Sequence, residues 1–488
     1  MLKPLNRITA DAMSRSVKVL QFGEGNFLRA FVDWIIDILN EKTSFNGDVQ
    51  VVQPIRNGMG ETINQQDGLY HLVLNGIKNG KATTEIRLIT CLREVINPYE
   101  NFEAFLETGE NADLRFIFSN TTEAGIAFNP DDKDPNRLPE SFPGKMTALL
   151  FHRYKHFKGA RDKGLFIIPC ELIDKNGQQL REIIFQFISL WKLPDDFKKW
   201  VSEHNTFCNT LVDRIVPGYP KETIKEIQEK IGYDDHLVVT AEPFHLWVIE
   251  GPESVRKAFP ADKADLDVKF VNDQSPYRTR KVRILNGAHT AMVPVAYLHG
   301  LRTVKESVED PFVGEFIKQA INEEIIPTLD LPHEELNQFA HDVIERFQNP
   351  FIRHELSSIA LNSISKFKVR VLPSILEYNG RKNTLPDRLV FSLACLIAFY
   401  KGDWQGTVTP VSDSPEIMAF FKEVWRSSNV DDVTKTVLSN QSFWDTDLTS
   451  VPGLTNRVST FLLNLEKGNV INAWDPSAIA SQKITIKP

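Results

Sequence analysis

The stretch that decides the fold runs from Val17 to Arg29 and reads VKVLQFGEGNFLR. Its first six residues are rich in apolar and β-branched side chains and end at a glycine, which predicts a short buried strand. Beyond the glycines, Phe27, Phe31 and Trp34 recur at helical spacing, so we expect a helix to follow directly. A strand, a glycine turn and a helix in this order predict the first unit of a doubly wound α/β fold.

Strand-like segments alternate with helical ones through the first half of the chain, which predicts a mostly parallel sheet covered on both faces. The strand-like segments are residues 49–53, 114–118, 165–169, 237–240 and 268–271, with an inserted hairpin over 70–74 and 84–89. Beyond about residue 280 the apolar pattern is helical, as over 332–347 and 389–400. We therefore expect a Rossmann-type α/β domain over residues 1–275 and a mainly α-helical, substrate-binding and catalytic domain over residues 276–488.

Composition excludes several classes of function. The 488 residues carry a net charge of -8 without a basic stripe, which argues against nucleic acid as a partner. The first 16 residues lack the apolar core of a secretory signal, and no apolar run reaches the length of a membrane span, so we expect a cytoplasmic protein without a membrane partner. Four scattered cysteines, with no CxxC or HExxH motif, predict reduced thiols and no metal site. The sequence leaves open whether the protein is a monomer or a dimer.

The glycine turn is the candidate cofactor site. Glycines in this place let the backbone approach a pyrophosphate, and the start of the following helix supplies N–H donors. Leu28 stands where the third glycine of the usual fingerprint would be, and GxG by itself also fits a plain structural turn. The position after the first strand favours a dinucleotide. The residues expected at this site are Phe22, Gly23, Glu24, Gly25, Asn26 and Phe27.

Two further strand ends are expected to contact the cofactor. At the end of the second strand, an Asp or Glu would favour NAD by accepting a hydrogen bond from the ribose 2′-hydroxyl. This chain has Gln53 instead, with Arg56 nearby, so these residues leave NAD and NADP both open. Asn120, Thr121 and Thr122 follow the third strand. They fit the start of a helix, and such a helix start would also border the nicotinamide.

The segment from Lys281 to Thr290 reads KVRILNGAHT and carries the groups that reduction of a ketone needs. Lysine can supply the proton, an asparagine amide can donate to the oxygen, and histidine can bind a neighbouring hydroxyl. Asn286 and His289 are three residues apart and share a face of a helix, and we expect Lys281 to reach the same point from the segment that enters it. An exposed lysine, a capping asparagine and a core histidine would fit the same letters.

The chemistry of lysine favours the reductive direction. Free lysine has a pKa of about 10.4, so holding it neutral at pH 7 costs roughly 4 to 5 kcal/mol. Oxidation of an alcohol therefore requires a site that lowers this pKa, by burial or by a cation such as Arg283. Reduction needs no such shift, because the ammonium group is already the proton donor.

The spacing Lys281-x4-Asn286-x2-His289 resembles the signature of the polyol-specific long-chain dehydrogenases, the mannitol dehydrogenase family. The likeness extends nearly from end to end and is most specific to family members that act on hexuronates. It includes residues 21–31, 119–127, 168–174, 212–215, 349–350, 447–448 and 451–454. The resemblance implies a metal-independent oxidoreductase that uses NAD and a small sugar-acid substrate.

The resemblance also implies roles for single residues. Lys281 matches the family's general acid and base, Asn286 an oxyanion donor and His289 a group that orients substrate. Asp213 matches an aspartate near the site, and His354 and Lys366 match positions that face substrate. The family's second oxyanion asparagine is replaced here by Leu172, for which Asn176 is only a weak substitute.

A uronate carries a carboxylate, and burying that anion without a partner would be costly. We therefore expect a cationic residue beside it, with Lys366, Arg370 and Arg283 as candidates; for Arg370 a surface charge is the simpler interpretation. The alternatives to this function are the sister activity on fructuronate, a neutral polyol substrate such as mannitol, and an inactive nucleotide-binding protein that senses redox state. The intact set of Lys281, Asn286 and His289 counts against the last of these.

Overall fold

The computed structural model describes residues 2–78, 80–121 and 124–474. The chain divides into two compact units. The first holds the chain up to Gly76 together with Lys81–Gln274, and the second holds Ile77–Gly80 and the chain from Ser275 onward.

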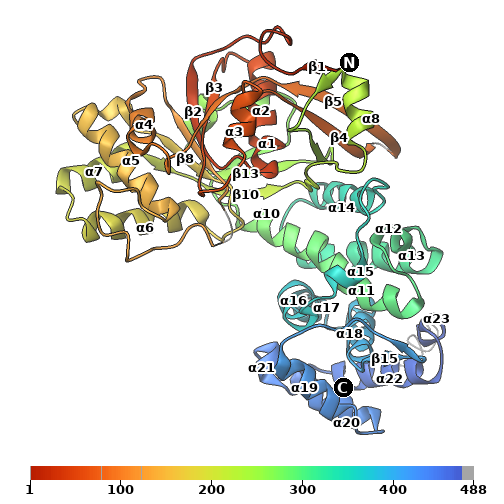
Figure 1. The fold of residues 1–488 in the computed structure, drawn as a ribbon. Helices are drawn as coiled ribbons and strands as arrows, with labels where there is room; N and C mark the ends of the chain where they lie inside the picture. Colours follow the sequence, from red (N-terminus) through yellow and green to blue (C-terminus); the bar gives the residue numbers. More distant parts are fainter. Residues whose placement is uncertain (1, 79, 122–123, 475–488) are drawn as a thin grey trace. The chain divides into compact units, whose positions relative to one another are not determined.

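A six-stranded parallel sheet forms the centre of the first unit, in the order β6-β3-β2-β7-β8-β9. Figure 1 labels β2, β3 and β8 of this sheet. The strands are β2 (Val17–Phe22), β3 (Asp48–Val52), β6 (Leu92–Ile96), β7 (Phe116–Ser119), β8 (Phe166–Pro169) and β9 (Thr206–Phe207). The strand order reverses between β2 and β7, and in such sheets ligands bind at the carboxyl ends of the two strands that flank the reversal. The Rossmann-type fold class predicted from the sequence is confirmed.

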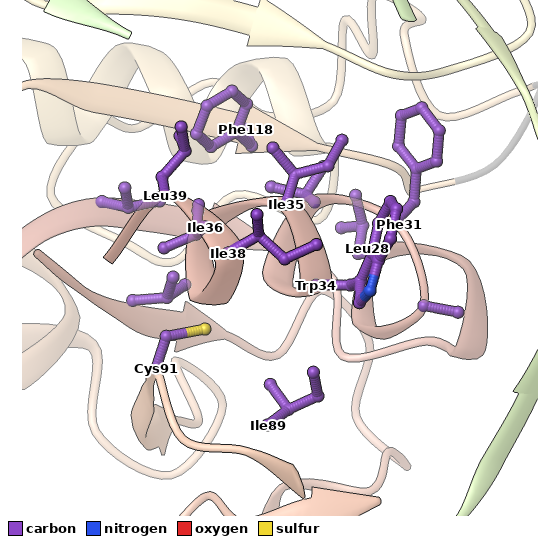
Figure 2. Close-up of a cluster of buried hydrophobic side chains, with 14 of the residues drawn as sticks. Leu28, Phe31, Trp34, Ile35, Ile36, Ile38, Leu39, Ile89, Cys91 and Phe118 are labelled. Atoms are coloured by element: carbon purple, nitrogen blue, oxygen red, sulfur yellow. The ribbon is translucent and has the colours of Figure 1, made fainter. Parts of the chain in front are cut away.

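Each face of this sheet is covered by its own apolar core, because successive side chains of a strand point to opposite faces. Leu20 and Phe22 of β2 pack with the helices α5 (Phe142–His156), α6 (Asn176–Leu190) and α7 (Asp195–His204). Val19, one residue away, packs on the opposite face with α2 (Val32–Lys42). Figure 2 shows part of this second core, where Ile35 and Leu39 of α2 lie with Phe118 of β7.

The helix after the glycine turn is interrupted, contrary to the single helix expected from the sequence. It consists of α1 (Asn26–Arg29) and α2. Two side chains that are distant in sequence donate hydrogen bonds to backbone carbonyl oxygens at the break. Tyr70 Oη donates to the Arg29 carbonyl at 2.7 Å, and an Arg214 nitrogen donates to the Ala30 carbonyl at 2.7 Å. A helix bends where its own ladder loses such acceptors.

Three smaller sheets complete the strands of the first unit, two of them three-stranded and one a parallel pair of β1 (Lys3–Pro4) and β11 (Tyr233–Asp234). The predicted hairpin is confirmed but longer than expected, with β4 (Tyr70–Lys78) and β5 (Lys81–Ile89) beside β12 (Val239–Ala241). In the other three-stranded sheet, β10 (Asn209–Asp213) pairs antiparallel with β13 (Leu246–Glu250), and β13 pairs parallel with β14 (Val268–Val271). The remaining elements are α3 (Gly60–Gln65), α4 (Phe102–Glu107), α8 (Ile224–Ile231) and α9 (Glu253–Ala258).

The second unit is mainly helical, as the apolar pattern predicts, and β15 (Asp403–Trp404) and β16 (Thr407–Val408) form a short hairpin in it. It begins with α10 (Ser275–Arg280), a π-helical segment (Lys281–Asn286) and α11 (Gly287–His299) in direct succession. The other helices are α12 (Val304–Glu309), α13 (Pro311–Gln319), a second π-helical segment (Ala320–Ile325), α14 (His333–Phe347), α15 (Leu356–Ile359), α16 (Ser363–Arg370), α17 (Leu372–Lys382), α18 (Asp387–Phe399), α19 (Pro415–Val424), α20 (Val430–Leu438), α21 (Gln441–Trp444), α22 (Leu454–Lys467) and α23 (Val470–Ala473).

Within the described residues, no helix is both long and apolar enough to cross a membrane. All four cysteines are buried and unpaired. The same described ranges contain no group of three or more His, Cys, Asp or Glu side chains that could hold a metal ion.

Asp33 on α2 gives the first unit a pH-dependent stability. Its side chain is fully buried, accepts a hydrogen bond from Gln21 Nε2 at 3.3 Å and lies 3.4 Å from Tyr70 Oη, and burial raises its pKa from 3.8 to about 7. The folded protein thus retains this proton up to about pH 7, whereas the unfolded chain releases it near pH 4. The contribution of Asp33 to the free energy of unfolding therefore falls as pH rises from about 4 to 7.

We expect Asp33→Asn to remove this loss and to be more stable than the parent at pH 8, by up to roughly 4 kcal/mol. At pH 4 the two proteins should be nearly equal, because the parent then carries a neutral carboxyl. Denaturant unfolding of both proteins at a series of pH values checks this. A difference between them that does not change with pH would contradict it.

Candidate active site

The glycine turn lies at the carboxyl end of β2, beside the reversal of strand order. Gly23 has φ +121°, and a Cβ on it would come within 3.0 Å of the Asn120 carbonyl oxygen that follows β7, so glycine is required there. Gly25 is exposed, and a Cβ on it would meet nothing within 4 Å. The turn is thus packed closely on the sheet side and open on the other, which is the space that a pyrophosphate needs.

Three buried polar side chains hold this turn in place. Gln21 Nε2 donates to the Gly23 carbonyl at 3.1 Å. The Arg29 guanidinium is fully buried and donates to the Glu24 carbonyl at 3.2 Å, to Asn26 Oδ1 at 2.7 Å and to the Leu237 carbonyl at 2.6 Å. Glu24 itself is buried, and its Oε1 accepts the Met59 N–H at 3.3 Å. The sequence pattern selected Glu24 and Asn26 for the site but not Arg29, which the helical spacing alone presents as one more helix residue.

The aromatic residues of the turn have mainly packing roles. Phe22 is fully buried, and its ring contacts those of Phe105 and Phe142 at centroid distances of 5.9 and 5.1 Å. Phe27 stacks on Phe31 at 5.1 Å. Phe22 can therefore contribute only its backbone to a bound cofactor.

At the end of β3, the side chain of Gln53 is hydrogen-bonded within the loop that follows the strand. Gln53 is buried, and both hydrogens of its amide are used within the following loop, by the carbonyls of Ile55 at 2.8 Å and Arg56 at 3.0 Å. Its Oε1 accepts the Gly60 N–H at 3.3 Å. Gln53 thus shapes the loop 55–60 and keeps only the second lone pair of its Oε1 for the ribose contact, which stays a prediction.

The end of β7 is held by a buried carboxylate. Glu171 accepts hydrogen bonds from Ser119 Oγ at 3.0 Å and from the Thr121 N–H and hydroxyl at 3.0 and 3.1 Å. Asn120 donates to the Cys170 carbonyl at 3.0 Å. Asn120 and Thr121 therefore occupy fixed positions next to the glycine turn, while Thr122 lies outside the described residues.

The residues of the first unit fit a dinucleotide. Such a site consists of an open glycine, a turn fixed by buried side chains and two strand ends at the reversal of strand order. A cavity of about 730 Å³ adjoins it between β3, β6 and α3, with Gln53, Arg56 and Gly58 in its lining.

In the second unit, Lys281, Asn286 and His289 lie on one uninterrupted run of helix. The sequence placed Lys281 in a segment that enters the helix, and this was wrong in one respect: Lys281–Asn286 is itself a π-helical turn. A π-helix bonds residue i to i+5, so it stacks Lys281 close to Asn286, whereas an α-helix would turn the two side chains well apart. Asn286 and His289 then share a face at the start of α11.

His289 occupies an apolar and positively charged environment. Its ring stacks on Phe347 of α14 at 3.9 Å and meets the edge of His354 at 5.2 Å. Its Nε2 is buried and has no hydrogen-bond partner in the described structure. Burial lowers the pKa of His289 far below its usual value, and the neighbouring His354 and the guanidinium groups of Arg346 and Arg370 lower it further. The imidazole is therefore neutral at pH 7 and retains an unused nitrogen.

One of the three candidate cations for a carboxylate, Arg370, acts on His289, and a second, Lys366, lies on the same helix as Arg370. Lys366 and Arg370 are four residues apart on α16 and thus on one face. Lys366 Nζ donates to the Ile359 carbonyl at 2.8 Å, and Arg370 has Thr290 Oγ1 at 3.5 Å. Burial lowers the pKa of both residues. Arg370 is half-buried, so it is not the plain surface charge that its sequence context favoured.

Arg283 has a different surrounding. Its guanidinium donates to Ser374 Oγ on α17 at 3.0 Å and feels the negative charge of Glu377. The structure adds Arg346, which is buried on α14 and whose charge acts on His289. Sequence reasoning missed Arg346 because the pattern of α14 shows only an apolar stripe that includes Phe347. The pattern does not indicate that Phe347 packs on His289, and so it does not indicate that Arg346 lies near this histidine.

The remaining predicted positions lie in the first unit. Asp213 is the last residue of β10 and is buried. Its backbone lies opposite that of Leu246 in the antiparallel pair of β10 and β13. Leu172, which replaces the family's second oxyanion asparagine, is 61% exposed. Asn176 is fully buried, and its amide donates to the carbonyls of Pro169 and Glu171, both at 3.0 Å. Asn176 is therefore committed to the β8–α6 connection and does not replace the missing donor.

Comparison with known proteins places this geometry in a family. Residues 17–263 match the model of the mannitol dehydrogenase Rossmann domain, and residues 273–466 match that of the mannitol dehydrogenase C-terminal domain. The chain is 49% identical over 470 residues to altronate oxidoreductase of Phocaeicola vulgatus, covering 96% of this chain and 98% of the relative. It is 50% identical over 469 residues to altronate oxidoreductase of Bacillus subtilis, covering 96% of both.

Solved structures share the fold at lower identity. D-sorbitol dehydrogenase in substrate-free form aligns with a TM-score of 0.82 and 23% identity, over 97% of this chain and 100% of that one. Mannitol 2-dehydrogenase of Pseudomonas fluorescens, solved with NAD and D-mannitol, aligns with a TM-score of 0.66 and 20% identity, over 98% and 100% of the two chains. The glycine turn at the reversal of strand order, the helical second unit and both domain matches lead to one conclusion: this chain is an oxidoreductase that belongs to the mannitol dehydrogenase family.

Proposed function

We propose that this protein is an NAD-dependent, metal-independent oxidoreductase that interconverts D-tagaturonate and D-altronate, a step in the breakdown of hexuronates such as galacturonate. The observation that carries the proposal is the set of Lys281, Asn286 and His289 on one helical run, in a chain about half identical to altronate oxidoreductases over 96% of its length. The buried, unpaired cysteines support a cytoplasmic location.

In the reductive direction, NADH supplies a hydride to the carbonyl carbon, and the protein must provide for the oxygen. Lys281 donates the proton that converts the alkoxide to a hydroxyl group, and it takes this proton back in the oxidative direction. The amide NH2 of Asn286 donates a hydrogen bond to the same oxygen and stabilises its developing negative charge. With Leu172 in place of a second asparagine, Asn286 carries this task without that partner.

His289 orients the substrate rather than moving a proton. A neutral imidazole has one donor and one acceptor nitrogen, and a sugar hydroxyl can serve either. Its unpartnered Nε2 is the atom we assign to this contact, with the ring fixed by Phe347 and His354. His354 and Lys366 then contact the rest of the sugar, and Asp213 supports the site.

The carboxylate of the uronate binds, in this proposal, to Lys366 and Arg370. These two cations share a face of α16, and the charge of Arg370 acts on His289, so an anion bound there would lie beside the orienting histidine. Arg283, already bonded to Ser374, is the weaker candidate.

A substrate panel tests the function as a whole. Tagaturonate, fructuronate and fructose are each reduced with NADH and with NADPH, and kcat/KM is measured for every pair. We expect tagaturonate with NADH to exceed fructuronate by at least tenfold and fructose by at least a thousandfold. A preference for fructuronate would assign the sister activity, a preference for fructose a polyol dehydrogenase, and turnover of none of them a binding protein.

A further inference from the structure

The carboxylate of Glu24 is buried at the centre of the glycine turn and is only partly satisfied. Its side chain is 6% exposed. Oε1 accepts the Met59 N–H at 3.3 Å, while Oε2 is shielded from solvent and has no hydrogen-bond partner in the described part of the chain. A buried carboxylate oxygen without a donor is costly, and a ligand that brings a donor removes that cost.

This carboxylate reaches the corner where the adenosine ribose of a dinucleotide lies. Glu24 starts from the turn after β2, but its oxygen meets the loop after β3. A Cβ on Gly58 of that loop would overlap Glu24 Oε1 and would approach Gln53 Cδ to 2.6 Å. Gly58 therefore leaves room for both side chains, and Glu24 carries a negative charge to the strand end where NAD-binding proteins usually have an acid of their own.

The neighbouring residues Gln53 and Arg56 are engaged in other contacts, so Glu24 is the candidate for discriminating between NAD and NADP. The amide hydrogens of Gln53 are bound to the carbonyls of Ile55 and Arg56. The guanidinium of Arg56, which could attract a 2′-phosphate, pairs with Glu140 at 3.1 Å and lies over the Tyr99 ring at 4.8 Å. Burial raises the pKa of Glu24, whereas the Met59 N–H and the charge of Arg29 favour its ionised form.

We infer that Glu24 is the residue that selects NAD over NADP: Oε2 accepts a hydrogen bond from a ribose hydroxyl, and its negative charge repels a 2′-phosphate. This inference rests on the proposed function, because it requires the dinucleotide to bind at the glycine turn. In this protein the acid that discriminates between the cofactors would thus lie in the turn after the first strand of the Rossmann fold, and not at the end of the second strand.

The test measures binding in the absence of sugar substrate, so that it does not depend on activity. Dissociation constants of NADH and NADPH are determined by calorimetry for the parent, for Glu24→Gln and for Glu24→Asp. Gln retains an oxygen for the Met59 N–H and replaces the other by an NH2 that can donate to a phosphate. The matched control is Glu103→Gln, which removes one negative charge from an exposed residue at the start of α4, outside the lining of the adjoining cavity.

We expect the parent to bind NADH at least 100-fold more tightly than NADPH. Glu24→Gln should reduce this ratio at least tenfold, mainly through tighter binding of NADPH, while Glu24→Asp and Glu103→Gln keep it within about threefold. An unchanged ratio in Glu24→Gln, or an equal reduction in Glu103→Gln, would overturn the inference while leaving the proposed function intact. A parent protein that binds neither dinucleotide would refute both. Thermal unfolding of each variant shows whether it is folded. If Glu24→Gln is not folded, the ratio of the NADPH and NADH dissociation constants in Glu24→Asp decides. Loss of selectivity in that variant, which keeps the negative charge, would contradict a role for the charge.

Discussion

Replacing Lys281 by alanine is expected to lower kcat for reduction of tagaturonate by about a thousandfold, with the affinity for NADH unchanged. Transfer of a proton by a positioned side chain contributes roughly a hundredfold to ten-thousandfold to a rate, and this variant removes the donor. Lys281 lies in the second unit and the glycine turn in the first, so cofactor binding should not suffer. Steady-state kinetics and calorimetric titration with NADH check the two parts separately.

Two further variants make this test specific. Lys281→Arg retains the positive charge but cannot release a proton near neutral pH, so it should be about as slow as alanine. Lys305→Ala removes a partly exposed lysine of α12 that pairs with Glu309 and should leave kcat within twofold. Full activity in Lys281→Arg would show that charge alone matters, and normal turnover in Lys281→Ala would remove the lysine from the mechanism.

The second large effect is expected from Arg370→Met. If its guanidinium binds the substrate carboxylate, kcat/KM for tagaturonate should fall roughly a hundredfold, because a hydrogen bond to a charged partner is worth about 1.5 to 3 kcal/mol. The slow reduction of fructose, which has no carboxylate, should change less than threefold. The double variant with Lys366→Met should approach a thousandfold loss on the uronate, because the two cations share one face of α16.

Arg283→Met is the matched control, since it removes a half-buried arginine that the structure pairs with Ser374. It should lower kcat/KM for tagaturonate by less than tenfold. If Arg283→Met instead causes the larger loss, the carboxylate site lies towards α17. An equal loss on tagaturonate and fructose in Arg370→Met would mean that Arg370 only supports the packing around His289.

Sequence reasoning predicted the strands well where two independent patterns agreed. The run from Val17 to Phe22 is β-branched, alternates between faces and ends at a glycine, and β2 has the predicted bounds. β13 (Leu246–Glu250) was missed, because a short apolar run resembles a buried helical turn as much as a strand. The break between α1 and α2 could not be foreseen either, since the side chains that cause it, Tyr70 and Arg214, come from distant parts of the chain.

The candidate site divides in the same way. Spacing alone indicated that Asn286 and His289 share a face, because three residues make nearly one helical turn. It could not indicate the π-helical segment that stacks Lys281 near Asn286, since that depends on how the helix packs. Gly287 lies where α11 packs closely on α16, because a Cβ on it would come within 3.0 Å of the Arg370 carbonyl oxygen.

By itself, the sequence determined the fold class, the glycine turn and the residue types that carry the chemistry, because these follow from local periodicity and from the few side chains that can move a proton or bind an oxyanion. Only the tertiary structure decided how the charges are arranged. It bound Gln53 to its own loop, brought Glu24 to the end of β3, and placed Arg346 and Arg370 near His289. Burial and charge act between residues that are distant along the chain, and no local pattern encodes which of them meet.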